Sequence, residues 1–218
     1  MARLTIAFFG PDGSGKTTLA QLLKNILAKK HGKVKVFWMR GMHTLALLIG
    51  LLLSKFSSMQ SNDTPFLRLR LRSRSIWCLL EVISLLPILL KFKFLKTLYP
   101  VIIAERCHID SAVWLRIYYS SNRLCGKVSS LLIKMGIYEF DVLTYVTAGL
   151  DTLLERKRNE GSNKEFLLRQ RLLYEAHYNV LVNLIDAYKV SLLRLDTSKA
   201  SISESLLKIL HQLYSHVK

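Results

Sequence analysis

A glycine-rich segment near the start of the chain, residues 10–18, limits what this protein can fold into more than any other feature. Its sequence, GPDGSGKTT, matches the pattern G-x-x-x-x-G-K-[ST], in which a loop between a strand and a helix cradles phosphate groups. Residues 4–9 form an apolar, β-rich run and residues 19–24 continue with helical spacing, as the pattern requires. The segment therefore predicts a loop that binds the triphosphate of ATP or GTP, and a glycine-rich turn that matches by accident is the alternative.

The residue types in this loop explain how it would hold a nucleotide. Glycines let backbone N–H groups converge on an anion, and the following helix directs the positive end of its dipole at the same point. Lysine adds a mobile positive charge, and the threonine hydroxyl is a ligand for Mg²⁺. The positions expected to contact the nucleotide are Gly10, Gly13, Ser14, Gly15, Lys16, Thr17 and Thr18.

The rest of the chain repeats the alternation of strand and helix. A first helix is expected at residues 16–30, ending at Gly32. Further strands are predicted at residues 33–39, 99–104, 141–146 and 190–195, and a helix is expected to start at Asp110-Ser111 after the third strand. Strand–helix–strand units of this spacing imply parallel pairing with right-handed crossovers. At 218 residues, the chain is predicted to form a single α/β domain with a doubly wound, five-stranded parallel sheet of the P-loop NTPase type.

Charged residues follow two of these strands, at the edge where open α/β sheets bind ligands. Arg40 follows the second strand and is a candidate phosphate contact, with a solvated loop arginine as the alternative. Glu105 and Arg106 follow the third strand. An acidic residue in this position typically holds Mg²⁺, and the adjacent arginine would face the same crevice, whereas the alternative is an ordinary surface ion pair.

A lid is expected after the fourth strand, around residues 153–166. A short basic helix leads into a polar, glycine-containing stretch, and Ser162 with Glu165 forms a capping-box pattern for a helix to about residue 187. Such a lid brings cations to the charge that develops during phosphoryl transfer, although the same arginines are also typical of a solvated helix face. Ser201 and Glu204 repeat the capping-box pattern before the last helix.

The middle of the chain contains two strongly apolar runs, residues 45–53 and 76–90. Both are shorter than the ~20 residues that a membrane-spanning helix needs. Between them, a helix is expected to start at residues 63–65 and to include the arginine-rich run at 67–74. Helices that are apolar on every face are usually buried on every face, so we expect a homodimer, with a membrane-surface role as the alternative.

Composition indicates the kind of partner and the compartment. Lysine and arginine outnumber aspartate and glutamate by 32 to 15, which favours nucleotides, nucleic acid or anionic membranes without choosing among them. The three cysteines, Cys78, Cys107 and Cys125, have no metal-binding spacing and are expected to be reduced core thiols. Nothing at the N-terminus resembles a cleavable signal, so we expect a cytoplasmic protein.

In this order of motifs, the chain resembles thymidylate kinases, including archaeal-type thymidylate kinase-like proteins, over nearly its whole length. The residues that carry the resemblance are the loop with Asp12 inside it, Arg40, Glu105-Arg106, the lid start at 150–156, and Asp196-Thr197-Ser198. The resemblance implies transfer of the γ-phosphoryl group of ATP to dTMP, with Mg²⁺. It also implies a homodimer that packs helices from the middle of the chain.

The resemblance assigns further roles. Asp12 would position the acceptor phosphate and its arginines, Arg40 and Arg106 would bind that phosphate, and Glu105 would hold Mg²⁺ through water. Either Arg156 or Arg158 would be the lid cation. Other assignments are Asp196 and Thr197 near adenine, Phe66 and Arg70 at thymine with Arg72 or Arg74 under a shifted alignment, and Tyr178 on the helix after the lid.

Two departures concern the acceptor side. The family usually has Asp-Arg-Tyr or Asp-Arg-His where this chain has Glu105-Arg106-Cys107, and Arg-Glu-Pro-Gly-Gly where it has residues 40–44, RGMHT. Phosphate chemistry is therefore better supported than thymine recognition. Two alternatives stay open: a kinase for another nucleoside monophosphate, or a nucleotide-binding protein that acts on nucleic acid or a membrane surface without a small acceptor.

Overall fold

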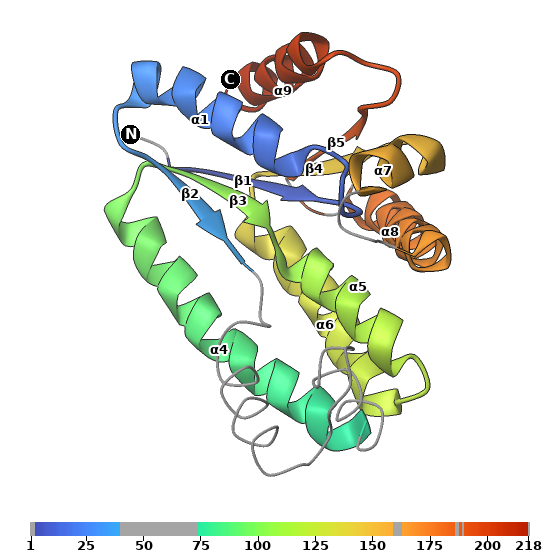
Figure 1. Cartoon of the computed structure of the whole chain (residues 1–218). Coiled ribbons are helices and arrows are strands. Elements are labelled where there is room, and N and C mark those ends of the chain that lie inside the picture. Colours follow the sequence, from blue (N-terminus) through green and yellow to red (C-terminus); the bar gives the residue numbers. More distant parts are fainter. Residues whose placement is uncertain (1–2, 40–73, 159–162, 186–187, 189, 218) are drawn as a thin grey trace.

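The computed structural model describes residues 3–39, 74–158, 163–185, 188 and 190–217, and within them the chain forms a five-stranded sheet in the order β2-β3-β1-β4-β5 (Figure 1). Every neighbouring pair of strands is parallel. The strands are β1 (Leu4–Phe9), β2 (Val34–Trp38), β3 (Val101–Arg106), β4 (Val142–Thr147) and β5 (Ser191–Asp196). The predicted sheet is confirmed, and each predicted strand begins within two residues of the observed one.

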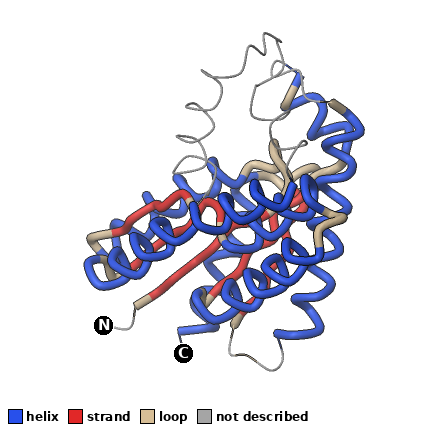
Figure 2. Tube along the Cα trace, turned by 90° about the horizontal axis from the view of Figure 1, so that it is seen from below, coloured by secondary structure: helices blue, strands red, loops and turns tan. Residues whose placement is uncertain are grey.

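Helices cover both faces of the sheet. Along β1, successive side chains point to opposite faces, so Ile6 and Phe8 pack with α1 (Lys16–His31) and α9 (Ile202–Val217). Ala7 and Phe9 pack in the opposite layer. That layer contains α4 (Arg74–Leu98), α5 (His108–Tyr119), α6 (Arg123–Glu139) and α8 (Lys164–Ile185). In Figure 2, which looks at this layer from below, helices lie over the strands.

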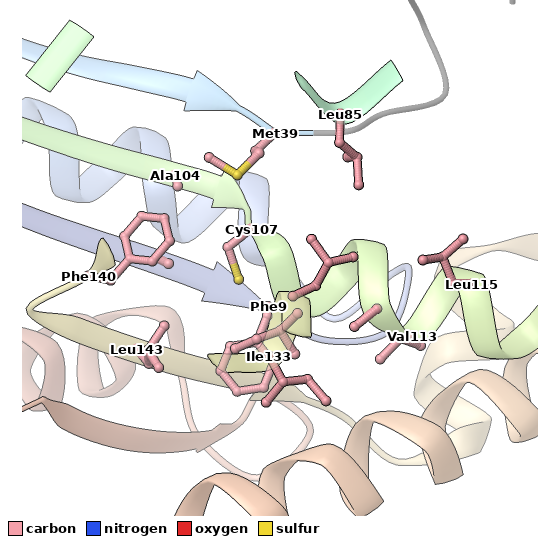
Figure 3. Close-up of a cluster of buried hydrophobic side chains, with 14 of the residues drawn as sticks. Phe9, Met39, Leu85, Ala104, Cys107, Val113, Leu115, Ile133, Phe140 and Leu143 are labelled. Atoms are coloured by element: carbon pink, nitrogen blue, oxygen red, sulfur yellow. The ribbon is translucent and has the colours of Figure 1, made fainter. Parts of the chain in front are cut away.

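The larger part of the core lies between the sheet and this second layer (Figure 3). Phe9 and Leu143 from the strands meet Val113 of α5 and Ile133 of α6, and all four side chains are buried. Both β1 and β4 are buried along their whole length, which explains why their side chains are mostly apolar, as is typical of central parallel strands. The packing holds the carboxyl ends of β1, β3 and β4 at one edge, where the functional residues gather.

The segment between β3 and β4 differs from the sequence-based expectation. The sequence predicts a helix that begins near Asp110, whereas the structure has two helices there, α5 and α6. The first begins at His108, because the Asp110 carboxylate accepts a hydrogen bond from the Cys107 N–H at 2.8 Å and caps the helix from its third position. Asn122 caps α6 in turn, its side chain accepting from two backbone N–H groups.

Helix caps explain the other boundaries. The predicted capping box of α9 is confirmed, since Ser201 N donates to Glu204 Oε2 at 2.7 Å and Glu204 N donates to Ser201 Oγ at 3.2 Å. The short helix after β4, α7, occupies Leu150–Arg156 and begins three residues earlier than predicted. For α8, Asn163 Oδ1 accepts from Glu165 N at 2.8 Å, and the predicted cap residue Ser162 lies outside the described residues.

The apolar run at 76–90 is helical and belongs to α4, while the predictions for residues 45–53 and 63–73 fall outside the described residues. None of the helices in the described ranges combines the length and apolarity needed to cross a bilayer. Cys78 of α4 and Cys125 of α6 form a disulfide with their Cα atoms 6.1 Å apart, so the expectation of three reduced thiols is wrong for this pair. Spacing along the chain did not reveal that the two helices bring these residues together. Cys107 is free and buried.

Candidate active site

The phosphate loop follows β1 and curves around the first turn of α1. Gly10, Gly13 and Gly15 have φ angles of 144°, 84° and 91°, a region that residues with a Cβ rarely adopt. Gly10 is also required by space, since a Cβ there would lie 2.0 Å from the carbonyl oxygen of Val146 in β4. The strand–loop–helix unit predicted from the sequence is confirmed, and the backbone explains its glycines.

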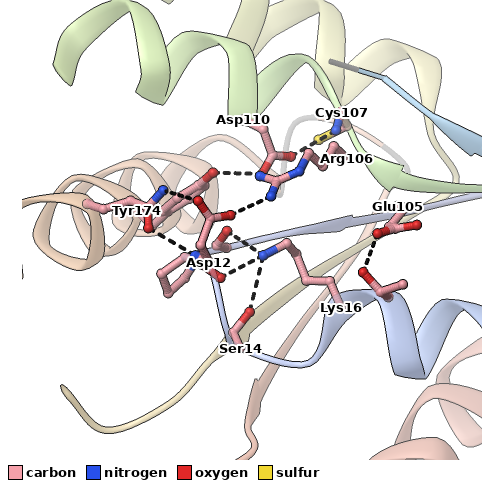
Figure 4. Close-up of polar contacts among 12 residues, drawn as sticks. Asp12, Ser14, Lys16, Glu105, Arg106, Cys107, Asp110 and Tyr174 are labelled. Carbon is pink, nitrogen blue, oxygen red and sulfur yellow. Dashed lines mark hydrogen bonds and ion pairs between the residues drawn. The ribbon is translucent and has the colours of Figure 1, made fainter. Parts of the chain in front are cut away.

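Lys16, the cation of the loop, is turned onto the loop's own backbone (Figure 4). Its Nζ donates to the carbonyl oxygens of Gly10 at 2.7 Å and Pro11 at 2.6 Å, and lies 3.3 Å from Ser14 Oγ. Burial, together with the positive charge of Arg106, lowers the pKa of Lys16 to about 8. The ammonium group is therefore charged at neutral pH and is held by carbonyl oxygens that an incoming phosphate would replace.

Thr17 and Glu105 meet at the mouth of the loop. Thr17 Oγ1, in the first turn of α1, donates to Glu105 Oε1 at the end of β3. A hydroxyl and a carboxylate beside a phosphate loop are the hard oxygen ligands that Mg²⁺ prefers, and this ion usually takes few protein ligands and keeps several waters. Within the described residues, no group of three or more His, Cys, Asp and Glu side chains could hold a metal ion. The two side chains fit a Mg²⁺ that is shared with nucleotide phosphates.

Arg106 lies between two carboxylates, as Figure 4 shows. Its Nη2 donates to Asp12 Oδ1 of the phosphate loop, and its Nη1 is 3.7 Å from Asp110 Oδ1 of α5. Burial alone would raise the pKa of Asp12, but Arg106 and Lys16 outweigh it and hold that pKa well below its usual range. Burial raises the pKa of Asp110. Nη1 of Arg106 is buried and makes no hydrogen bond in the described part of the chain, although it forms the ion pair with Asp110.

Two site residues on α8, Gln170 and Tyr174, were missed by the sequence reasoning. Tyr174 Oη donates to Asp110 Oδ1 at 2.7 Å, and Gln170 hydrogen-bonds to Asp12. Both belong to the buried face of the helix, which follows helical spacing from Leu167 to Leu181. That spacing is visible in the sequence and marks the buried face, but a polar residue on it is not by itself a sign of contact with the phosphate loop.

Arg156 closes the other side of the loop. At the last position of α7, its Nη1 donates to the Gly13 carbonyl oxygen at 3.1 Å and to Thr197 Oγ1 at 2.9 Å, and its Nη2 donates to the Thr197 carbonyl oxygen at 3.1 Å. Arg158 is exposed and does not line the cavity at the loop. Between the two cations that the sequence left open, the structure places Arg156 at the phosphate loop.

Asp12, Lys16, Thr17, Arg106 and Arg156 line a cavity of about 470 Å³ at the carboxyl edge of the sheet, whereas Glu105, Asp110, Gln170 and Tyr174 are not part of its lining. Its volume is in the range of small-molecule sites. The lining comes from the phosphate loop and α1, the end of β3, the end of α7, and the segment from β5 into α9. The residues are Asp12, Gly13, Gly15, Lys16, Thr17, Thr18, Leu19, Arg106, Arg156, Lys157, Thr197, Ala200, Ile202 and Ser205.

The remaining sequence-based candidates lie elsewhere. Tyr178 stacks on Tyr145 of β4 with ring centroids 5.1 Å apart and lies under the guanidinium of Arg194 of β5. Its ring therefore packs α8 against these two strands and does not line the cavity. Asp196 accepts hydrogen bonds from Ser198 and is not part of the lining either. Arg40, Phe66, Arg70 and Arg72 lie outside the described residues, as does the side chain of Arg74.

Comparison with known proteins identifies the fold. No protein-family model matches the sequence, and no curated protein matches it. Deoxyadenosine kinase from M. mycoides, solved with the products dCMP and a flexible dCDP bound, aligns with a TM-score of 0.57 and 16% identity over 97% of this chain and 100% of that chain. Its dATP-bound structure gives the same values. Thymidylate kinase from Candida albicans aligns with a TM-score of 0.62 and 14% identity over 98% of this chain and 92% of that chain.

The protein therefore has the five-stranded parallel α/β fold of the P-loop NTPase type that these kinases share, as predicted. At these identities the likeness establishes the fold alone. At the level of the fold, the resemblance to thymidylate kinases is confirmed, whereas the archaeal-type label is not.

Proposed function

We propose that this protein is a single-domain, ATP-dependent kinase that transfers the γ-phosphoryl group to a nucleoside monophosphate, with dTMP as the favoured acceptor. The observation that carries the proposal is the arrangement of two pairs at the phosphate loop, in which Asp12, Thr17 and Arg106 line one cavity and Glu105 contacts Thr17. Thr17 and Glu105 meet beside Lys16 on the donor side, and Asp12 and Arg106 meet across the loop. The kinase structures that share the fold act on or bind deoxynucleotides, as their names state, which supports a nucleotide substrate.

Phosphoryl transfer requires positioning and charge stabilisation more than a covalent nucleophile. Lys16 would exchange the carbonyl oxygens of Gly10 and Pro11 for donor phosphate oxygens, and the loop N–H groups would bind the same anion. Arg156, already beside Gly13, would stabilise charge on the transferred group. Mg²⁺, held at Thr17 and Glu105, would neutralise charge on the donor phosphates when bound.

On the acceptor side, Arg106 supplies a guanidinium that lines the cavity and whose Nη1 has no hydrogen-bond partner among the described residues. Guanidinium groups bind phosphate with good geometry, and Asp12 fixes the opposite side of this one. Arg40, Phe66, Arg70 and Arg74 stay proposed acceptor ligands on the basis of sequence. Tyr178 would need to leave its stack with Tyr145 to join them.

A deoxynucleoside acceptor is the second candidate. Two observations favour it. The fold aligns with that of deoxyadenosine kinase, and the positive charge of Arg106 is already paired with the carboxylates of Asp12 and Asp110, which leaves less of it for an acceptor phosphate. A 5′-hydroxyl acceptor requires a general base instead of a phosphate-binding cation. Asp12 is a weak base, because the positive charges of Arg106 and Lys16 hold its pKa well below its usual range.

A single assay separates these functions. ATP consumption is followed with Mg²⁺ and a panel of acceptors: dTMP, dUMP, UMP, CMP, AMP, GMP, deoxyadenosine, deoxycytidine and thymidine, with a no-acceptor blank. Turnover that depends on dTMP supports the first proposal, and turnover that depends on a deoxynucleoside replaces it with the second. Acceptor-independent hydrolysis or none, together with salt-sensitive binding to oligonucleotides or anionic liposomes, would support the nucleic-acid or membrane alternative instead.

We also propose that the protein is a cytoplasmic homodimer. One exposed face of α4 is apolar, because large hydrophobic side chains recur on it every three or four residues. This α4 stripe consists of Leu79, Ile83, Leu86, Leu90, Phe94 and Leu98. On α6, Leu124, Leu131 and Tyr138 are exposed at seven-residue spacing. An apolar face of this length is typical of an interface. A second copy of the chain has the same apolar face, so the two faces could bury each other in a homodimer.

A further inference from the structure

Gln170 of α8 makes two hydrogen bonds to one residue of the phosphate loop. Its Oε1 accepts from the Asp12 N–H at 2.9 Å, and its Nε2 donates to Asp12 Oδ2 at 3.2 Å. The side chain is completely buried. Because an N–H can only donate and a carboxylate can only accept, the amide fits in one orientation and satisfies both groups.

The same carboxylate carries Arg106. Asp12 Oδ2 is bound by Gln170, which leaves Oδ1 for Arg106 Nη2. A chain of three side chains therefore runs from α8 through the loop to the end of β3. One helical turn further along α8, Tyr174 holds Asp110, the second carboxylate beside Arg106. One face of α8 thus fixes both anions that orient the guanidinium.

We propose that Gln170 is a positioning residue that fixes Asp12, and through Asp12 the guanidinium of Arg106, for the acceptor. The inference rests on the proposed kinase function for its effect on turnover. Two side chains of this length can donate to the Asp12 carboxylate and accept from the Asp12 N–H at the same time. They are glutamine and protonated glutamic acid. Leucine has the shape without either group, and an ionised glutamate accepts from the Asp12 N–H but repels its carboxylate.

The test uses these differences. Gln170→Leu and Gln170→Glu are compared with wild type, and Gln212→Glu on α9, remote from the cavity lining, controls for the added charge. The KM and kcat for acceptor and for ATP are measured from pH 6 to 8. Gln170→Leu is expected to lower kcat/KM for the acceptor about ten-fold or more, with the KM for ATP changed less than about two-fold.

Gln170→Glu gives the sharper readout. Position 170 contacts Asp12, and the charged or titratable groups that interact with Asp12 are Lys16, Arg106 and Tyr174, with Asp110 beside Arg106 and Tyr174. Lys16, whose pKa is lowered to about 8, also titrates in wild type near this pH range, so the quantity measured is the ratio of variant to wild type. Protonation of the introduced carboxylate at low pH restores a donor to Asp12 Oδ2, and the ratio for acceptor kcat/KM is expected to rise about ten-fold as pH falls from 8 to 6. The Gln212→Glu ratio stays flat.

If Gln170 has only a structural role, kcat/KM for the acceptor and for ATP should change together, or the ratio of Gln170→Glu to wild type should not depend on pH. Either outcome overturns the proposal. Hydrogen exchange of the loop peptide containing Asp12, measured with and without Mg·ATP, separates this inference from the proposed function. Faster exchange in Gln170→Leu by about ten-fold, with the helix α1 peptide unchanged, upholds the positioning role even if wild type transfers no phosphoryl group. Unchanged exchange at Asp12 refutes it.

Discussion

Lys16 Nζ lies 2.7 Å from the carbonyl oxygen of Gly10 and donates a hydrogen bond to it, so the cation of the phosphate loop is held by the residue that begins the loop. Gly10 cannot carry a side chain, because a Cβ would clash with Val146 of β4. Gly10, at the start of the loop, therefore packs against β4, and Lys16, at the end of the loop, donates a hydrogen bond back to it. This arrangement keeps the ammonium group beside the site where a phosphate would bind.

Lys16→Ala is expected to lower phosphoryl transfer by about 10³-fold, because it removes the mobile charge that stabilises the transferred group. The fold should survive, since the hydrogen bonds of the lysine are made to its own loop. Transfer is measured by ATP consumption with the best acceptor, and folding by circular dichroism. Lys24→Ala, further along the same helix, is the matched control; turnover near wild type in the Lys16 variant would remove the assignment.

The lowered pKa of Lys16 predicts a pH effect on stability. In the unfolded chain, Lys16 has its ordinary pKa of 10.5. In the folded protein, burial and the positive charge of Arg106 lower the pKa of Lys16 to about 8. Between these values the unfolded state binds more protons, so the free energy of unfolding rises with pH, by up to about 3 kcal/mol. Urea unfolding of the ligand-free protein at pH 7 and 9.5 measures it. Lys16→Met should lack this rise, and equal slopes in the two proteins would contradict the prediction.

Glu105→Gln is expected to raise the Mg²⁺ concentration for half-maximal turnover about ten-fold, because the amide is a poorer partner for the ion. Glu105→Asp keeps the carboxylate on a side chain one methylene shorter and should retain most activity. The measurement is a Mg²⁺ titration at saturating ATP. Glu139→Gln, whose carboxylate pairs with Lys96 away from the cavity, should leave the titration unchanged. A Glu105→Gln curve that overlays wild type would show that Glu105 does not hold the metal.

Arg156 and Arg158 can be separated by kinetics. Arg156→Ala removes three hydrogen bonds at Gly13 and Thr197 and should lower kcat/KM for ATP about ten- to a hundred-fold. Arg158→Ala should stay within about two-fold of wild type, since that side chain is exposed and does not line the cavity. Steady-state kinetics at saturating acceptor give both values. The reverse order of effects would make Arg158 the lid cation.

The α4 stripe predicts a change of oligomeric state. Leu90 is 68% exposed in its centre, and Leu207 of α9 is 65% exposed outside it. If a second copy covers the stripe, Leu90→Glu places a charge in the interface and shifts dimer to monomer, whereas Leu207→Glu does not. Sedimentation velocity at micromolar concentration distinguishes the species. A wild-type monomer at that concentration would refute the homodimer.

The sequence by itself determined the phosphate loop and the order of strands and helices. Both are local properties: the glycine spacing of residues 10–18 and the apolar runs of the strands lie within a few residues of one another. The pairing of Thr17 with Glu105 also followed in outline, because parallel strands in such a sheet end at one edge. Helix α5 begins at His108, earlier than the sequence predicts, since the side-chain cap of Asp110 acts backwards along the chain.

Only the tertiary structure decided which side chains from distant parts of the sequence are in contact. Asp12 contacts Arg106 across 94 residues of sequence and Gln170 across 158, and the disulfide of Cys78 with Cys125 spans 47. It also placed Arg156 rather than Arg158 at the loop and left Tyr178 in a stack with Tyr145. These contacts depend on how α5, α7 and α8 pack against the sheet. Packing sums many weak contacts over the whole domain, so no local pattern of residues encodes it.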